Sequence, residues 1–174
     1  MKTSKILSKL FLGMALFAGI ISFAQKATKN VVEVAVGSKD HTTLVAAIKA
    51  AGLVETLSGK GPFTVFAPTN AAFNKLPKGT VENLLKPENL KTLQGILTYH
   101  VVAGKLDSKA VVAAITAGKG KAVLTTVQGA KLTASLKGKS VVLTDEKGGV
   151  ATVTAVDLDA SNGVIHVIDG VLMH

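Results

Sequence analysis

The order of two sequence patterns most constrains the fold of this 174-residue chain. Before Lys121 apolar residues recur at helical spacing, whereas after it short runs of Val, Thr and Leu alternate with Gly and Lys turns. Helices followed by strands favour an α+β fold over a parallel sheet of alternating strands and helices. No linker-like run or internal repeat interrupts residues 31–174, so we expect one domain, with a helix-rich N-terminal half and a strand-rich C-terminal half.

Capping residues and helix breakers place the elements expected before Lys121. Asp40 and Asp107 are suitable N-caps, and Pro87 suits the first turn of a helix. A β-rich run ends at a proline, after which Thr69 or Asn70 can cap a short helix. The expected helices cover residues 40–51, 53–57, 70–76, 87–97 and 110–115, and the expected strand covers 63–67.

Five strands are expected in the second half, and the last of them is predicted to be central. Residues 164–168 carry apolar side chains on both faces, so this strand would bury His166. An unsatisfied buried polar group costs about 1–3 kcal/mol, so we expect Tyr99 and His100 to join a buried polar set with His166. The expected strands cover residues 122–127, 130–136, 140–144, 150–156 and 164–168, and the clearest hairpin turn is Glu146-Lys147-Gly148-Gly149.

The first residues have the pattern of an export signal. Lys2, Lys5 and Lys9 precede an apolar run that is too short to span a membrane comfortably, and Ala24 is a suitable cleavage residue. We predict a signal peptide at 1–24, a flexible lead-in at 25–30 and a secreted domain at 31–174, in the periplasm, on the cell surface or in the medium, without stable membrane insertion after cleavage. A membrane anchor or a buried helix is the alternative. Cleavage removes three lysines and no acid, which lowers the formal charge from +9 to +6.

Composition and motifs exclude several functions. The chain has no cysteine, which excludes disulfides, a thiol nucleophile and cysteine-ligated metals. Its 20 basic residues are all lysine, so base readout by arginine is not expected. Tyr99 is its single tyrosine, so base stacking is not expected either, and we predict no nucleic-acid partner. The sequence has no nucleotide-loop, serine-hydrolase or zinc-protease motif, and its four histidines are far apart. We therefore expect no enzyme activity, no cofactor and no metal site.

Two acidic segments are better explained as turns than as sites. The segment that starts at Asp157 begins like a calcium loop, but its sixth and twelfth positions hold Asn162 and Ile168 in place of glycine and glutamate. Asp145 and Glu146 are adjacent on a turn, where two carboxylates cannot flank a substrate.

Lysines are mildly concentrated in the strand-rich half. If the hairpins align them, they form a basic face for acidic glycans or lipid headgroups. Ordinary solvated surface is the alternative. The candidates are Lys119, Lys121, Lys131, Lys137 and Lys139, with Lys147 nearby.

Three segments, in order along the chain, resemble the fasciclin (FAS1, beta-Ig-H3) domain family. Residues 63–73 are similar to its first homology box, residues 97–104 to its central Tyr-His segment, and residues 162–172 to its second box. The resemblance covers nearly all of the predicted mature chain. It implies a wedge-shaped β-sandwich of two sheets with helices packed alongside, and a non-catalytic extracellular role in adhesion.

The resemblance also implies roles for particular residues. Asp157 and Leu158 match the place of an Asp-Ile pair that is implicated in integrin recognition in animal members, although an ordinary turn acid beside a buried leucine is the alternative. Asn70 stands where many members have aspartate, and His174 where proline is common. The residues expected to hold the motifs together are Thr69, Asn70, Tyr99, His100, Asn162, Gly163, His166 and Asp169.

These observations predict a monomeric, non-catalytic extracellular adhesion module. Its expected partner is a cell-surface protein, a matrix protein or an acidic polysaccharide. A secreted carrier that binds a small apolar ligand between helices and sheet is the alternative, and would show an enclosed apolar pocket. A hydrolase is the third hypothesis, and requires a Ser–His or His–carboxylate contact in a cleft.

Overall fold

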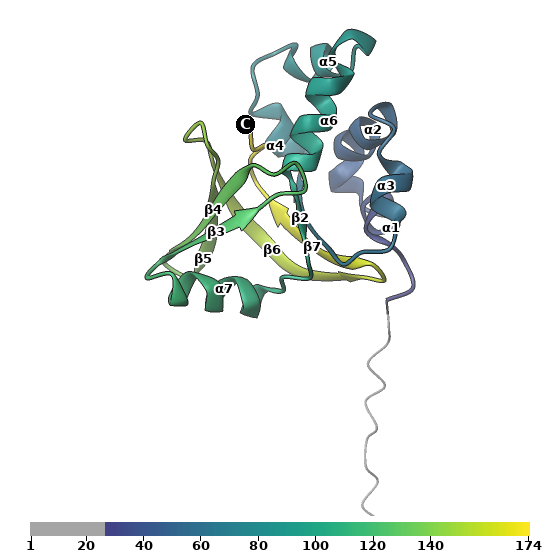
Figure 1. Cartoon of the computed structure of the whole chain (residues 1–174). Coiled ribbons are helices and arrows are strands. Elements are labelled where there is room, and N and C mark those ends of the chain that lie inside the picture. Colours follow the sequence, from purple (N-terminus) through teal and green to yellow (C-terminus); the bar gives the residue numbers. More distant parts are fainter. Residues whose placement is uncertain (1–26) are drawn as a thin grey trace, which may run out of the picture.

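The computed structural model describes residues 27–174, and the predicted signal peptide lies outside them (Figure 1). Seven helices and seven strands make up the described part of the chain, which confirms the α+β class. The strands are β1 (Phe63–Pro68), β2 (Val101–Ala103), β3 (Lys121–Thr125), β4 (Lys131–Lys137), β5 (Ser140–Thr144), β6 (Val150–Ala160) and β7 (Gly163–Ile168).

The seven strands form one sheet in the order β2-β1-β7-β6-β5-β4-β3. β1 and β7 are parallel, and the other neighbours are antiparallel. The outermost strands meet at a bridge between Val102 and Thr126, so the sheet curls until it is nearly closed. Two sheets were expected, whereas β6 joins all the strands into one sheet, because it pairs with β5 at its start and with β7 further along.

β6 bends where it passes from one half of the sheet to the other. Its register with β7 shifts between Val153 and Ala155, and again between Ala155 and Leu158. Asp157, inside the second shift, has φ 58°, a left-handed conformation that residues other than glycine rarely adopt. Such bulges increase the twist of a strand and redirect its side chains, so this bend both curls the sheet and sets the direction of the Asp157 side chain.

Helices cover the sheet at two places. Figure 1 shows the first six on the side of the molecule where β2 and β7 lie, with α5 (Thr80–Leu84) beyond α6 and away from the sheet, whereas α7 (Ser108–Ala117) lies below β3, β4 and β5. Short 3-10 helices at Lys39–His41 and Pro87–Asn89 precede α2 and α6. The first six helices are α1 (Val31–Val36), α2 (Thr42–Ala50), α3 (Val54–Ser58), α4 (Asn70–Asn74), α5 (Thr80–Leu84) and α6 (Leu90–Tyr99).

Two apolar clusters form the core, one on each face of the curled sheet. The first joins the helices to β1 and β7 and includes Leu44, Ile48, Leu97 and Ile165. The second fills the inside of the curl beneath α7 and includes Phe66, Ile115, Leu132, Leu143 and Ile168. Burial of this apolar surface is the main stabilising contribution in a chain that has no disulfide.

The structure changes several predicted boundaries. Asp40 does not cap the second helix, because the chain first makes a 3-10 turn there and α2 begins at Thr42. α5 and β2 were not predicted, because they are too short to show a periodicity. α1 was not predicted either, since its valines favour a strand by composition. The Asn30 side chain accepts hydrogen bonds from two backbone N–H groups of α1, and the Glu33 carboxylate accepts the Asn30 N–H, so a capping box begins this helix.

Candidate functional site

His166 lies in the middle of β7 and is 2% exposed. Its Nε2–H donates to the Leu106 carbonyl at 2.7 Å, and its Nδ1 accepts the Asp157 N–H at 3.4 Å. The Phe66 ring stacks on the imidazole with centroids 5.6 Å apart. Every polar atom of the ring therefore has a partner from the protein.

Thr64, which the sequence analysis did not select, completes this polar set. Its buried hydroxyl donates to the Gly104 carbonyl at 2.6 Å and accepts the Leu106 N–H at 2.8 Å. Thr64 of β1 therefore binds the Leu106 N–H, and His166 of β7 binds the Leu106 carbonyl. We call these two residues the clamp, because together they fix the connection that leads from β2 into α7.

Asp157 reaches from the bend of β6 to the first turn of α7. Its Oδ1 accepts the Ser108 N–H at 2.7 Å, and its Oδ2 accepts the Ser108 hydroxyl. Burial raises the pKa of this carboxyl, but the hydrogen bonds from Ser108 outweigh it, so the pKa of Asp157 is lowered. Leu158 beside it is 39% exposed, which corrects the alternative of a buried leucine.

Ser108, Asp157 and His166 include the residue types of a hydrolase triad but not its bonding pattern. In such a triad the serine hydroxyl donates to a histidine nitrogen. Here the Ser108 hydroxyl donates to Asp157, and both nitrogens of His166 are occupied by backbone groups. No nitrogen of His166 is left to accept the Ser108 proton, so this geometry activates no nucleophile.

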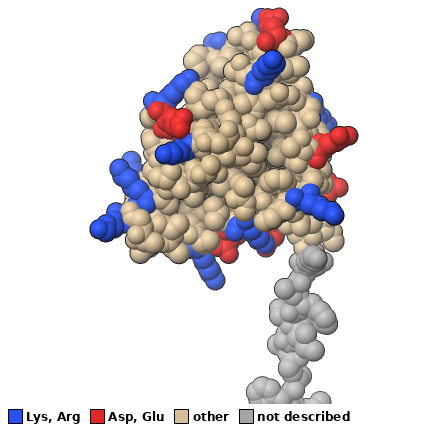
Figure 2. Space-filling model, viewed as in Figure 1, with Lys and Arg blue, Asp and Glu red and all other residues tan. Residues whose placement is uncertain are grey.

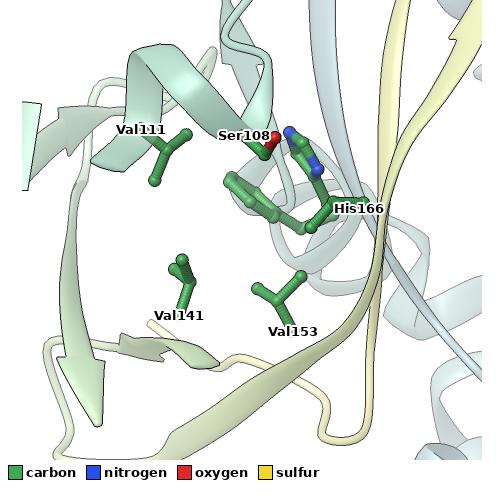
Figure 3. A pocket seen from close by; sticks show the side chains of 7 residues that line it. Ser108, Val111, Val141, Val153 and His166 are labelled. Carbon is green, nitrogen blue, oxygen red and sulfur yellow. The ribbon is translucent and has the colours of Figure 1, made fainter. Parts of the chain in front are cut away.

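A small apolar cavity lies beside the Ser108 hydroxyl and the His166 ring. Figure 3 shows these two side chains at one wall and the valines of α7, β5 and β6 at the others. Its volume is about 10 Å³, which is about what one water molecule needs. The cavity lies between helix and sheet, where the alternative of an apolar-ligand carrier would place the ligand, but its volume is far below the roughly 300–1,000 Å³ of ligand pockets. The valines are Val111, Val141, Val153 and Val156.

Tyr99 and His100 belong to a second polar set, separate from that of His166. The Leu172 N–H donates to His100 Nε2 at 3.0 Å, so the proton lies on Nδ1, which donates to the Ile96 carbonyl at 2.7 Å. Burial lowers the pKa of His100 to about 4. The Tyr99 hydroxyl donates to the Lys131 carbonyl at 2.8 Å, and burial raises its pKa.

Thr69 and Asn70 connect β1 to the helices. The Thr69 hydroxyl accepts the Ala72 N–H at 3.2 Å and caps α4. Asn70 Oδ1 accepts the Thr43 N–H at 3.0 Å, and its Nδ2 donates to the Lys39 carbonyl at 3.0 Å. The second of these bonds needs an amide, so an aspartate at this position could not make it.

Asn162 and Asp169 stand at the two ends of β7 and tie it to other elements. Asn162 Oδ1 accepts the Val31 N–H at 2.9 Å, and its Nδ2 donates to the carbonyls of Leu57 and Gly59. Asp169 Oδ1 accepts the Thr152 N–H at 2.7 Å. A Cβ on Gly163 would overlap the Phe63 carbonyl, so the close approach of β1 and β7 requires glycine there.

The candidate lysines divide into two groups. Lys121 pairs with Ser135 in the β3–β4 hairpin, and Lys137 lies two residues further along, so both are at the same end of this hairpin. Lys119 and Lys139 lie in the adjoining turns, at the same end. Lys131 lies at the opposite end, paired with Thr125. Lysine side chains project from this side of the molecule in Figure 2.

Residues 27–174 contain no group of three or more His, Asp or Glu side chains that could hold a metal ion. None of the helices in that range has the length and apolar character needed to cross a membrane.

Comparisons with known proteins agree on one family. A family model described as the fasciclin domain matches residues 39–174. The chain is 51% identical over 150 residues to the Synechocystis protein sll1483, covering 86% of this chain and 76% of that one. It is 40% identical over 137 residues to the immunogenic protein MPB70 of Mycobacterium bovis, covering 76% and 62%.

Similarity extends to an animal protein and to a solved structure. The chain is 42% identical over 143 residues to the transforming growth factor-beta-induced protein ig-h3 of Sus scrofa, covering 82% of this chain and 19% of that one. A FAS1 domain pair from the insect cell adhesion molecule fasciclin I superposes with a TM-score of 0.75 at 18% identity. The alignment covers 85% of this chain and 52% of that one, so the chain spans about half of the pair and shares its fold.

Proposed function

The chain belongs to the fasciclin domain family, whose members are typically extracellular, adhesion-related and non-catalytic, and on this basis we propose that it is a secreted, monomeric adhesion module. It attaches to an acidic polysaccharide through the lysine end of the β3–β4 hairpin. The lysine end consists of Lys119, Lys121, Lys137 and Lys139.

One observation carries this proposal: four ammonium groups gather at one end of a hairpin without acidic partners. The two ion pairs found among residues 27–174 use Lys75 and Lys105, so the lysine end keeps its charge available. An uncompensated group of like charges attracts a polymer of opposite charge and speeds its encounter. All four side chains are exposed.

The surface beside the lysine end suits a polysaccharide. α7 packs on the inner face of this hairpin through Val111 and Ile115, whereas the outer face presents Val123 at 61% exposure together with Thr125 and Thr133. Hydroxyl and small apolar groups on a strand face offer hydrogen bonds and contact area to sugar rings. A charged end beside such a face supports contact with a chain of acidic sugars.

Binding to an acidic polysaccharide at two salt concentrations tests the proposal. Replacing all four lysines by Gln removes contacts worth about 0.3–0.5 kcal/mol each, so affinity for polygalacturonate is expected to fall about tenfold. The matched control replaces four exposed lysines near the helices, Lys49, Lys78, Lys86 and Lys91, by Gln and keeps the same net charge. Equal losses in both variants would show attraction by net charge alone and would overturn the assignment of the lysine end.

The segment Asp157-Leu158 supports a second candidate, contact with a cell-surface or matrix protein. Leu158 is exposed and lies next to Val156, which is 45% exposed. Asp157 is engaged by Ser108, so Leu158 rather than the carboxylate is the group presented to a partner. Leu158→Ser would reduce binding to such a protein and leave polysaccharide binding unchanged.

Export of the chain is the remaining part of the proposal. N-terminal sequencing of the protein recovered outside the cytoplasm is expected to begin at Gln25. Recovery of material that still begins at Met1 or Lys2 would contradict cleavage after Ala24.

A further inference from the structure

An open groove lies where β6 turns into β7, away from the lysine end of the β3–β4 hairpin. Its walls are the loop from α3 to β1, the β6–β7 turn and the side chain of Lys105, and it encloses about 640 Å³. In Figure 1 this turn is at the lower right, whereas β3, β4 and β5 are at the left. The volume is within the range of ligand sites in proteins.

The frame of the groove is held by contacts within the protein. Asn162 binds Val31 of α1 and the carbonyls of Leu57 and Gly59, so its side chain fastens the β6–β7 turn to both neighbouring elements. A Cβ on Gly61 would overlap the Asn162 carbonyl, so the loop and the turn are in direct backbone contact. The two walls therefore keep their spacing without a ligand.

Apart from Asn162, the polar side chains that line the groove are cationic or carry a hydroxyl. Lys60 and Lys105 stand on different walls, and Ser58 and Ser161 add a hydroxyl on each side. Lys105 donates to Asp159 at 3.0 Å, which restrains its ammonium group. Lys60 is exposed and is absent from the ion pairs formed within residues 27–174.

We propose that this groove binds a short stretch of a polysaccharide built from uronic acids. The carboxylate of one sugar pairs with Lys60, and the ring hydroxyls bind the two serines. Lys105, whose charge Asp159 already balances, donates a hydrogen bond to an oxygen of the next sugar. The lining has no aromatic side chain and the groove is open to solvent, so it does not enclose a lipid or an apolar ligand. The groove is separate from the lysine end but serves the same proposed adhesive role. Together, the groove and the lysine end allow one domain to bind a polymer at two points.

Titration of the 15N-labelled protein with trigalacturonate, followed by NMR, tests the groove directly. The amide signals of Gly59, Gly61 and Gly163 are expected to shift. The double variant Lys60→Gln/Lys105→Gln is expected to lose about threefold in affinity, whereas Lys49→Gln/Lys91→Gln is not. Ser161→Tyr fills the groove without changing charge, and is expected to abolish the shifts at the three glycines.

The outcomes separate this proposal from the proposed function. If the four-lysine variant of the hairpin keeps the glycine shifts but loses polygalacturonate binding, both sites exist. If the glycines do not shift, or if neutral galactotriose shifts them equally, the groove proposal is overturned while the lysine end remains open to its own test. If Ser161→Tyr leaves the shifts unchanged, the ligand lies elsewhere and the proposal is again overturned.

Discussion

The clamp between β1 and β7 and the lysine end of the β3–β4 hairpin use polar side chains in opposite ways. At the clamp, Thr64 and His166 are buried and each of their polar atoms is bonded to the protein. At the lysine end, the side chains are exposed and have no acidic partner within residues 27–174. The first region depends on its polar groups for folding, and the second keeps them available for a partner.

This contrast has a physical basis in the cost of burial. A buried polar group that loses its partner costs about 1–3 kcal/mol, so the clamp tolerates little change. An exposed charge is already solvated, and substitutions there usually change stability by less than about 0.5 kcal/mol. Stability measurements should therefore detect changes at the clamp, and binding measurements should detect changes at the lysine end.

His166→Ala is expected to give the largest effect. The substitution removes a buried ring that packs on Phe66 and leaves the Leu106 carbonyl without its donor. Cavity formation and the lost hydrogen bond together are expected to lower the free energy of unfolding by about 3–5 kcal/mol. Urea unfolding measures this change, with Lys121→Ala as the surface control. An unchanged midpoint would refute the structural role of His166.

A pH effect at His100 is expected to be next in size. The folded protein holds His100 with a pKa of about 4, against an ordinary value of 6.5. Between these values the unfolded chain binds a proton that the folded chain does not, so stability falls as the pH falls. The loss is about 3 kcal/mol on going from pH 6.5 to pH 4.

His100→Gln isolates this contribution, because Gln does not titrate. The variant is expected to lose less stability than the parent protein between pH 6.5 and pH 4. His41, whose pKa burial also lowers, is present in both proteins and cancels in the comparison. Identical pH profiles for parent and variant would show that His100 is not held neutral by the fold.

The burial of His166 was predicted better than the polar network around it. Apolar residues on both sides of His166 identified a central strand and a buried imidazole, because burial leaves a periodic pattern. The partners could not be predicted, since Leu106 contributes backbone groups that carry no sequence signal. Tyr99 and His100 were expected to join His166, but they bond to Lys131 and Leu172, which lie elsewhere in the sheet and at the C-terminal end.

The surface was predictable in composition but not in arrangement. The lysines of the hairpins were recognised, but only the strand register separates Lys121 and Lys137 from Lys131. Lys60 and Lys105 gave no signal, because the groove joins segments about 100 residues apart in the chain, from Ser58 to Gly163. Ser108 was also missed, since its contact with Asp157 depends on the bend in β6.

Asp157→Asn is expected to have a moderate effect on stability, because Asp157 shares exposure with the lysine end and hydrogen bonding with the clamp. Its side chain is near the surface, but its carboxylate accepts two hydrogen bonds at the first turn of α7. Removing the charge is expected to lower the free energy of unfolding by about 0.5–1 kcal/mol. Because hydrogen bonding lowers its pKa, this contribution is present above pH 3.8 and is lost below it. Thermal melts at pH 7 and pH 3 measure both effects, and an equal difference at the two pH values would contradict this role.

The four-lysine variant is expected to change stability least. Lys119, Lys121, Lys137 and Lys139 are exposed, and they belong to neither ion pair found in the described part of the chain. Replacing them by Gln is therefore expected to change the free energy of unfolding by less than about 0.5 kcal/mol, while binding to polygalacturonate falls. Because the substitutions relieve repulsion between neighbouring ammonium groups, a small gain in stability is expected at low salt. A loss of 2 kcal/mol or more, on the scale of a missing buried hydrogen bond, would mean that these lysines support the fold as His166 does, and the contrast between the two regions would fail.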